Sequence, residues 1–366
     1  MQLEAFQQAA AYVKQAVADG LTPSAALAIG VGDRVYVKEA WGVTSHTPEG
    51  TPVNEHTLYD MASVTKMLST TMVTLRLIAR GVLDLADMLP RYFGDLVPED
   101  KKEITLFHLL THTSGYPAHI RLDQAGVAPA DALSFFLNAP LAYPTGTAVE
   151  YSCVGFIVLG KLLERVTGRR LDELAAEEVF RPLGMDHTGY HPLDRPIDPA
   201  NTAFTERSIW DGTWLRGRVH DENAYLLGGV AGNAGVFSDL DDCIRFARML
   251  AGRGALDGQV FLPRCIFAAA IQNYTPGMDE NRGLGFHLAN GYYSYSGRFF
   301  DQGGFGHNGF TGPHIFVSPA TGLWVALLTN RVHPTRENAT HLRLRRVLHT
   351  LMAVDYETLM REEGRG

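Results

Sequence analysis

The sequence predicts an α/β fold in which the two ends of the chain build one layer of strands and helices around a helical middle. Runs of β-forming residues lie near both ends, and helical patterns dominate between residue 63 and about residue 225. The expected strands are Ser24–Gly30, Arg34–Trp41, Thr57–Met61, Tyr292–Phe300, His314–Ser318 and Leu323–Thr329. Strands at both ends around a helical middle indicate one α/β domain that carries an inserted helical domain.

The helices are predicted by apolar periodicity and by their end signals. The first runs from about residue 3 to residue 18 before Gly20, and a long one runs from Ser63 to about Arg80 before Gly81. The other expected helices are Thr105–Thr111, Pro129–Leu137, Cys153–Thr167, Leu171–Val179, Ser238–Leu250 and Arg336–Met360. We therefore expect an α/β domain of residues 1–62 plus 231–366 and a mainly helical domain of residues 63–230.

Composition excludes several classes of protein. The 366 residues are 46% hydrophobic and 20% charged, which is typical of a globular chain with a large core. The net charge of −8 argues against a nucleic-acid partner, because such proteins need a basic surface for phosphates. No apolar run reaches about 18 residues, so no membrane partner is expected either. Nothing in the sequence indicates an oligomeric state.

The N-terminus and the cysteines favour a cytoplasmic protein. Residues 1–20 lack a basic start followed by an apolar core, so no signal peptide is visible, although a trimmed export signal would leave the same sequence. Cys153, Cys243 and Cys265 lie far apart and form no C-x-x-C pair. We expect free thiols rather than a disulfide framework.

Most standard catalytic motifs are absent. The chain holds no G-x-S-x-G elbow, no H-E-x-x-H pair and no phosphate-binding P-loop. His108 and His112 have i, i+4 spacing, which can hold a metal ion, but without a third ligand nearby we expect structural or capping roles. The glycines of residues 228–235 lack the βαβ setting of a dinucleotide site. No metal and no organic cofactor are expected.

One short motif carries chemistry. Ser63 and Lys66 form an S-x-x-K tetrad where a β-like run meets a long helix, so Lys66 lies one turn along the same helix face as Ser63. A serine at a helix N-terminus faces unpaired N–H groups that favour a developing oxyanion. A buried lysine of lowered pKa can deprotonate the hydroxyl. The alternative is a chance match, with Ser63 as an ordinary N-cap.

Two further elements extend this motif. Tyr151 stands at the entry to a helix, where a phenol beside a lysine can pass a proton to a leaving group; otherwise it packs under a loop. Residues 306–309 read Gly-His-Asn-Gly before a strand, and the glycines allow backbone and imidazole to approach a substrate. The N–H of Phe310 is then a candidate second oxyanion donor opposite that of Ser63. The alternative for this segment is a tight hairpin turn.

The three elements in this order resemble the serine β-lactamase and penicillin-binding-protein superfamily, whose motifs are S-x-x-K, Y-x-N or S-x-N, and K-T-G or H-x-G. The resemblance covers nearly the whole chain. Its blocks are residues 62–66 (ASVTK), 104–115 (ITLFHLLTHTSG), 151–168 (YSCVGFIVLGKLLERVTG), 182–185 (PLGM), 228–238 (GGVAGNAGVFS), 306–312 (GHNGFTG) and 328–335 (LTNRVHPT). Tyr151 matches the branch of class C β-lactamases, family VIII esterases and D-aminopeptidases. The segment from His220 resembles homologues of the penicillin-binding-protein-4 type.

The resemblance implies an antiparallel sheet flanked by helices, an inserted all-helical domain, and an active site in the cleft between the two domains. It implies that Ser63 is the acylated nucleophile, Lys66 its partner and Tyr151 the proton-transfer group, and that His307 occupies the place of the third-motif lysine. The expected oxyanion and substrate-binding residues are Ser63, Phe310, Gly309, Cys153 and Asn308.

Two positions depart from the family pattern. Cys153 replaces the asparagine of Y-x-N, whose amide would hold Lys66 and the substrate, and a thiol is a poor hydrogen-bonding substitute. His307 replaces a lysine, which removes the permanent charge that would attract the carboxylate of a β-lactam. Both changes favour an esterase, or a D-amino-acid peptidase or amidase, over an efficient β-lactamase.

The sequence therefore predicts a serine hydrolase that forms an acyl-enzyme on Ser63. The expected substrate is a small ester or related acyl compound, and the alternative is a β-lactam or a short D-amino-acid peptide. A second alternative is a catalytically weak scaffold or binding protein on the same fold. Retention of Ser63, Lys66, Tyr151 and His307 argues against a scaffold, which has no need of all four.

Overall fold

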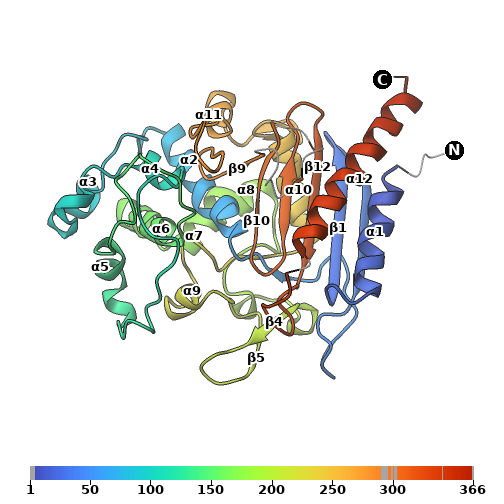
Figure 1. Cartoon of the computed structure of the whole chain (residues 1–366), viewed down its shortest axis with the longest axis horizontal. Coiled ribbons are helices and arrows are strands. Elements are labelled where there is room, and N and C mark those ends of the chain that lie inside the picture. The colour runs from blue at the N-terminus through green and yellow to red at the C-terminus, as the bar shows by residue number, and fades with distance from the viewer. Residues whose placement is uncertain (1–4, 290–295, 298–299, 301–302, 340, 365–366) are drawn as a thin grey trace.

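The computed structural model describes residues 5–289, 296–297, 300, 303–339 and 341–364. A six-stranded antiparallel sheet forms its centre, with the strand order β2-β1-β12-β11-β10-β9 (Figure 1). Its strands are β1 (Ser24–Val31), β2 (Arg34–Gly42), β9 (His287–Leu288), β10 (Phe305–Asn308), β11 (His314–Val317) and β12 (Leu323–Thr329). The first two strands join the later four through the pairing of β1 with β12. The predicted antiparallel sheet built from both ends of the chain is confirmed.

Helices cover both faces of this sheet. Helices α1 (Gln7–Ala18) and α12 (His341–Glu362) lie side by side on one face, and α10 (Leu240–Ala251) packs on the other (Figure 1). Burial on both faces explains why β12 is apolar throughout rather than alternating. Leu323, Val325 and Leu327 pack with α1 and α12, whereas the residues between them belong to the larger core on the other side.

The remaining chain is mostly helical and joins the larger core. Its α-helices are α2 (Met72–Ala79), α3 (Pro90–Phe93), α4 (Leu106–Leu110), α5 (Ala132–Leu137), α6 (Cys153–Thr167), α7 (Leu171–Ala175), α8 (Arg181–Leu183), α9 (Glu222–Leu226) and α11 (Arg264–Ala270). Three two-stranded pairs complete the fold: β3 (Tyr59–Asp60) with β6 (Phe237–Ser238), β4 (Phe204–Arg207) with β5 (Trp214–Arg216), and β7 (Ala255–Leu256) with β8 (Gln259–Val260). The β4–β5 hairpin lies inside the segment expected to be mainly helical.

Three helices begin at other residues than the sequence predicts. The long helix expected from Ser63 begins as a π-helix at Lys66–Thr71 before α2, and the helix expected from Ser238 begins at Leu240 because Ser238 ends β6. The last helix begins at His341 rather than at Arg336.

Most of the strand expected at Tyr292–Phe300 lies outside the described residues. The division into domains at residues 62 and 230 stays a prediction. None of the described helices combines the length and hydropathy needed to span a membrane.

Candidate active site

Ser63 is placed by the short pair β3–β6. Strand β3 ends at Asp60, whose carboxylate accepts hydrogen bonds from the backbone N–H of Ala62 at 2.8 Å and of His220 at 2.7 Å. Ala62 has a φ of 42°, in the left-handed region, so the chain turns sharply just before Ser63. The Lys66 N–H then bonds to the Ser63 carbonyl at 3.1 Å. Ser63 thus lies in the turn that starts the helical segment, as the S-x-x-K spacing requires.

Lys66 is fully buried and its ammonium group has three hydrogen-bond acceptors. The Nζ lies 3.1 Å from Ser63 Oγ, 3.4 Å from Cys153 Sγ and 3.1 Å from the Asn233 carbonyl. An ammonium carries three donors, so these contacts account for all of them. The π-helix that begins at Lys66 is a rare element that often marks functional sites. This arrangement holds the amine against the candidate nucleophile.

Tyr151 is positioned by the entry to α6. Ser152 caps this helix through the Gly155 N–H at 2.9 Å, and its own N–H bonds to His112 Nδ1 at 3.0 Å. The Tyr151 ring then lies 4.8 Å from Lys66 Nζ and 5.9 Å, between ring centroids, from His307. The phenol therefore stands between the lysine and the imidazole, although the three residues are far apart in the sequence.

The Tyr151 hydroxyl is enclosed and has no hydrogen-bond partner within the described part of the chain. Burial raises the pKa of Tyr151, and the nearby Lys66 ammonium only partly opposes this effect. The phenol is therefore protonated at neutral pH, and it can donate its proton to an incoming leaving group.

Lys66 and Cys153 shift each other's pKa. Burial disfavours the thiolate, but the Lys66 ammonium and the neighbouring His119 outweigh it and lower the pKa of Cys153. Burial likewise acts against the ammonium, but Cys153 and Tyr151 outweigh it and raise the pKa of Lys66. The lysine is thus charged at rest, and its pKa is shifted in the direction opposite to the one considered from the sequence.

His307 is buried and neutral. It lies on β10, and its Nδ1 is 2.9 Å from the Asn308 carbonyl, which can only accept, so Nδ1 carries the hydrogen. Burial, with Lys66 and Arg282 nearby, lowers the pKa of His307 to about 3. Its Nε2 has no partner among the described residues and is left as an acceptor. The third motif therefore contributes a lone pair rather than a positive charge.

The backbone N–H groups of Ser63 and Phe310 are the oxyanion donors expected from the sequence. They make no hydrogen bond within the residues that the structure describes. Phe310 is held from behind by Arg331, whose Nε donates to the Phe310 carbonyl at 2.7 Å and whose guanidinium lies 4.3 Å from the ring centroid. A Cβ at Gly309 would meet the Met61 carbonyl oxygen at 2.5 Å. Glycine at 309 is what lets this turn approach the Ser63 segment.

The strand before this turn is only partly paired in the described part of the chain. There, β9 pairs with Phe305 and Gly306 of β10 but not with His307 or Asn308. On its other side Asn308 pairs with His314 of β11.

Sequence reasoning missed three residues of this site. Arg282 lies with its guanidinium 5.2 Å from the Tyr151 ring centroid; it is 3% exposed and paired with Glu280. Asn233 offers its carbonyl to Lys66, and its buried amide has no partner in the described chain. His119 bonds to Cys153. Arg282 and His119 have no sequence motif, and only contacts between distant segments of the chain reveal them. Asn233 lies in a glycine-rich block, which was the one local sign of a functional segment.

The two histidines with metal-ligand spacing have structural roles. His108 completes a capping box with Thr105 at the start of α4. His112 accepts the Ser152 N–H and packs against the Tyr151 ring at 4.8 Å between centroids. The expectation of structural or capping roles is confirmed.

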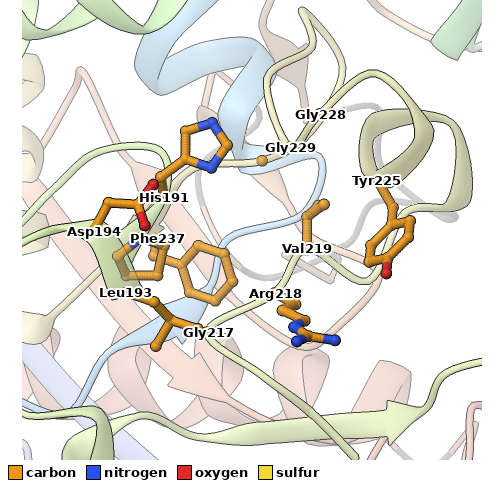
Figure 2. Close-up of a pocket in the computed structure, with 12 residues that line it drawn as sticks. His191, Leu193, Asp194, Gly217, Arg218, Val219, Tyr225, Gly228, Gly229 and Phe237 are labelled. Atoms are coloured by element: carbon orange, nitrogen blue, oxygen red, sulfur yellow. The ribbon is translucent and has the colours of Figure 1, made fainter. Parts of the chain in front are cut away.

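A separate pocket of about 210 Å³ lies beside the segment 217–237 (Figure 2). It is lined by residues from three stretches, among them His191, Arg218, Tyr225 and Gly229, and includes none of the four candidate catalytic side chains. A Cβ at Gly229 would meet the His191 ring at 2.7 Å, so the glycine makes room for the imidazole. We assign no chemistry to this pocket.

The site combines a serine, a buried lysine one helical turn later and a tyrosine beside them, next to an antiparallel sheet flanked by helices. This arrangement is typical of a serine hydrolase that forms an acyl-enzyme. The profile of the family described as Beta-lactamase matches residues 9–350. The chain therefore belongs to this family, and it is a serine hydrolase of the β-lactamase and penicillin-binding-protein class.

Relatives with known names support this assignment. The chain is 31% identical to the N-acetylmuramyl-L-alanine amidase of Bacillus subtilis (strain 168), over 85% of this chain and 78% of the relative. It is also 31% identical to a putative D-alanyl-D-alanine carboxypeptidase of Escherichia coli (strain K12), over 90% and 83% of the two chains.

Among solved structures, EstCE1, a hydrolase with promiscuous acyltransferase activity, has the same fold. Its TM-score is 0.74 at 21% identity, with 95% of this chain and 98% of that chain covered.

Proposed function

We propose that this protein hydrolyses small, uncharged acyl esters through an acyl-enzyme on Ser63. The observation that carries the proposal is the convergence of Ser63, Lys66 and Tyr151 on a neutral His307. The cations near the site already have partners. Arg282 is buried and paired with Glu280, and the Lys66 ammonium is buried and bonded to three acceptors, so a substrate carboxylate would have to displace one of these partners. A site of this kind favours an acyl group without a charge next to the reacting carbonyl.

The first step needs a free amine at Lys66. We assign this to the pair with Cys153: the ammonium passes one proton to the thiolate, which gives a neutral amine and a thiol. Lys66 then takes the Ser63 proton as Oγ attacks the carbonyl carbon. The oxygen of the tetrahedral intermediate lies between the N–H groups of Ser63 and Phe310.

The second half returns every proton. Tyr151 protonates the leaving alkoxide as the C–O bond breaks, and the Lys66 ammonium restores the phenol proton. His307 is neutral and its Nε2 is unprotonated, so it accepts a hydrogen bond there, and Tyr151 serves as the acid. Water then attacks the acyl-enzyme and gives its proton to the lysine–tyrosine pair. The acid is released as Ser63 regains its hydrogen, and the Cys153 thiol returns its proton to Lys66.

A second candidate function is hydrolysis of an amide bond next to a D-amino acid. It is favoured by the relative named a putative D-alanyl-D-alanine carboxypeptidase, at 31% identity. The other relative at 31% identity, named an N-acetylmuramyl-L-alanine amidase, supports amide hydrolysis but not a D-amino acid. The same Ser63 acyl-enzyme serves both reactions, because they differ only in the leaving group that Tyr151 must protonate. The scaffold alternative has less support, because the hydrogen-bonded Ser63, Lys66 and Cys153 form a complete proton-transfer set.

One substrate panel tests these functions. Rates are measured on p-nitrophenyl butyrate, nitrocefin and D-alanine p-nitroanilide with the parent chain and with Ser63→Ala. We expect the butyrate ester to be the fastest and the variant to lose turnover of all three. Dominant hydrolysis of the anilide would select the amidase function, and dominant nitrocefin turnover would select the β-lactamase function. Turnover by Ser63→Ala equal to that of the parent would overturn the mechanism.

A further inference from the structure

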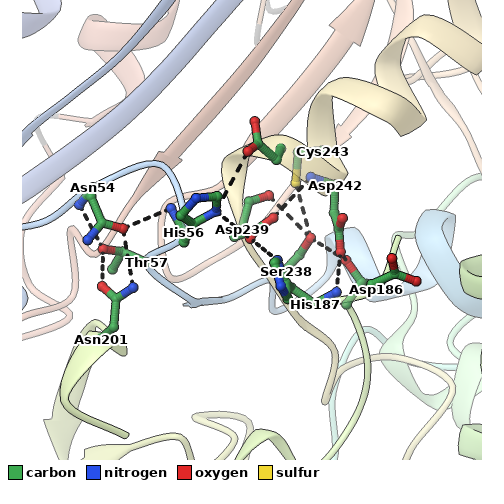
Figure 3. A network of polar contacts seen from close by, with 12 residues as sticks. Asn54, His56, Thr57, Asp186, His187, Asn201, Ser238, Asp239, Asp242 and Cys243 are labelled. Carbon is green, nitrogen blue, oxygen red and sulfur yellow. Dashed lines mark hydrogen bonds and ion pairs between the residues drawn. The ribbon is translucent and has the colours of Figure 1, made fainter. Parts of the chain in front are cut away.

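A second group of polar side chains lies outside the catalytic residues, where three distant segments of the chain meet (Figure 3). His56 comes from the loop before β3, His187 from the loop after α8, and Asp239 from the start of α10. The ligand atoms of the three side chains all lie within 4.8 Å of one another. Such a convergence of two imidazoles and a carboxylate is the side-chain set of a metal site.

The two carboxylate oxygens of Asp239 make different contacts, one with the helix and one with the histidines. Its carboxylate caps α10 by accepting the Asp242 N–H through Oδ1 at 3.0 Å. Its Oδ2 faces the histidines, 2.7 Å from His187 Nδ1 and 3.7 Å from His56 Nδ1. The Asp239 side chain is fully buried, whereas the two histidines are about half exposed, at 49% and 53%. The carboxylate is thus fixed in place while the imidazole side stays open to solvent.

Asp241 lies beside this cluster, outside the group of three whose ligand atoms all lie within 4.8 Å of one another. Asp241 Oδ2 lies 3.6 Å from His56 Nδ1, while its Oδ1 is held by Lys38 Nζ at 2.6 Å. Asp239, Asp241 and Asp242 bring three carboxylates to the first turn of α10, and Lys38 pairs directly with one of them. A divalent cation would balance the remaining negative charge.

We propose that His56, His187 and Asp239 bind one Zn²⁺ ion, and that Asp241 completes the tetrahedron by turning toward it. Nitrogen ligands together with carboxylate oxygens suit zinc, whereas calcium and magnesium take oxygen ligands almost exclusively. Bonds of about 2.0–2.1 Å in a tetrahedron place ligand atoms about 3.3 Å apart. His56 Nδ1 and Asp239 Oδ2 are 3.7 Å apart, which is close to that value, whereas His187 Nδ1, at 2.7 Å from the same oxygen, must move away from it. His187 would exchange its hydrogen bond to Asp239 for a bond to the metal.

This ion would have a structural role rather than a catalytic one. It would tie the segment before β3 to the segment after β6, and these two strands pair through Tyr59 with Ser238 and Asp60 with Phe237. Asp60 in turn orients the turn that carries Ser63. Because the ion binds the folded chain and not the unfolded one, bound zinc must raise stability.

The test uses ZnCl₂ and CoCl₂ with the full chain freed of metal by a chelator and then dialysed. Calorimetric titration should give one Zn²⁺ per chain, and zinc should raise the Tm. The Co²⁺ form should show the visible absorption of a tetrahedral site. His56→Ala and His187→Ala should each weaken zinc binding at least about tenfold. Both side chains are half exposed, so circular dichroism should show these variants folded.

His46→Ala is the matched control, since His46 is also an exposed loop histidine but lies outside the cluster. It should bind zinc like the parent. Equal zinc affinity in all three variants, or no zinc binding at micromolar concentrations, would overturn the proposal. CaCl₂ or MgCl₂ raising the Tm as much as ZnCl₂ would overturn the choice of metal. None of these measurements depends on hydrolytic activity, so they stand apart from the proposed function.

Discussion

The Nζ of Lys66 lies 3.4 Å from the Sγ of Cys153, at the position where the family pattern has an asparagine. An amide at this position can only hold the lysine, whereas a thiol of lowered pKa can also take its proton. In the sequence, Cys153 in place of asparagine argued against efficient catalysis. In the proposed mechanism, the same residue exchanges a proton with Lys66. The following predictions test this pair and the side chains around it.

Cys153→Ser should lower kcat/KM on p-nitrophenyl butyrate by about 10- to 100-fold, because a hydroxyl cannot hold the proton that Lys66 must give up. The parent should also react with iodoacetamide at Cys153 faster than at Cys243, a buried thiol whose pKa is raised by burial. Intact mass and peptide mapping measure the labelling. Cys243→Ser is the matched control and should keep full activity. A fully active Cys153→Ser would remove the thiol from the mechanism.

Ser63→Ala should abolish the single adduct that a fluorophosphonate probe forms with the parent. Lys66→Ala and Tyr151→Phe should each cost roughly 10³-fold in kcat, because each removes a proton-transfer group that touches the reacting atoms. Intact-mass spectrometry and initial rates provide the readouts. An adduct that persists in Ser63→Ala would place the nucleophile elsewhere.

His307→Lys should change the preference of the site rather than only reduce its rate. A charged side chain in place of the neutral imidazole should raise the ratio of nitrocefin to p-nitrophenyl butyrate turnover by about tenfold, since a charge-assisted hydrogen bond favours a substrate carboxylate. His307→Gln supplies a neutral control and should leave the ratio near that of the parent. An unchanged ratio in His307→Lys would show that the charge at this position does not select substrates.

Gly309→Ala should lower kcat by about 10²-fold with little change in KM. Its Cβ would meet the Met61 carbonyl at 2.5 Å, which forces the Phe310 N–H away from the oxyanion position. A Cβ at Gly322, in the half-buried turn between β11 and β12, would have its nearest neighbour at 3.4 Å, an ordinary contact distance. Gly322→Ala, which is strained by its φ of 72°, should cost stability but not kcat. Equal kcat values for Gly309→Ala and the parent would argue against Phe310 as an oxyanion donor.

Stability should fall as the pH drops below about 6.5, and a histidine pair contributes to this fall. His314 and His349 are buried with their Nε2 atoms 2.6 Å apart, and burial together with Arg345 lowers the pKa of His349 to about 3. Below the ordinary histidine pKa the unfolded chain binds a proton that the folded chain excludes. His349 therefore removes about 1.4 kcal/mol of stability per pH unit between about 6.5 and 3.

The measurement is urea unfolding of the parent and of His349→Gln between pH 7.5 and 4.5. The variant is less stable at neutral pH, but its stability should fall less steeply with decreasing pH. His46→Ala should keep the slope of the parent, because His46 is exposed. Identical slopes for His349→Gln and the parent would show that His349 is not neutral in the folded state.

The sequence predicted the fold class and the strands β1, β2, β11 and β12, because local patterns determine them. It did not predict β9 or β10, the strand that carries His307. The helix Cys153–Thr167 and the strand Leu323–Thr329 have the predicted bounds, since a capping serine and a continuous apolar run mark them. The π-helix at Lys66–Thr71 was not predicted, because an extra residue per turn is set by packing rather than by periodicity.

In the candidate site, too, some residues could be predicted from the sequence and others could not. Ser63, Lys66, Tyr151 and His307 follow from short motifs, and the structure brings their side chains together. Arg282 carries no motif and enters only because its chain segment folds against Tyr151. The cluster of His56, His187 and Asp239 is a still clearer case, since three segments without any shared pattern supply one ligand each. The catalytic roles remain predictions that the variants above test.

The packing of α1 against α12 has a practical consequence. The two helices are tied by the Ala9 N–H, which donates to Asp355 at 3.1 Å, and they lie together on the face of the sheet opposite α10 (Figure 1). The start of α12 lies at the Gly309 turn, where Arg345 donates to the Gly309 carbonyl at 3.1 Å. Carrier proteins, affinity tags or surface tethers should therefore be attached at the other end of this helix pair, near residue 362. Immobilised enzyme prepared through these helices should therefore keep its catalytic groups open to dissolved substrate.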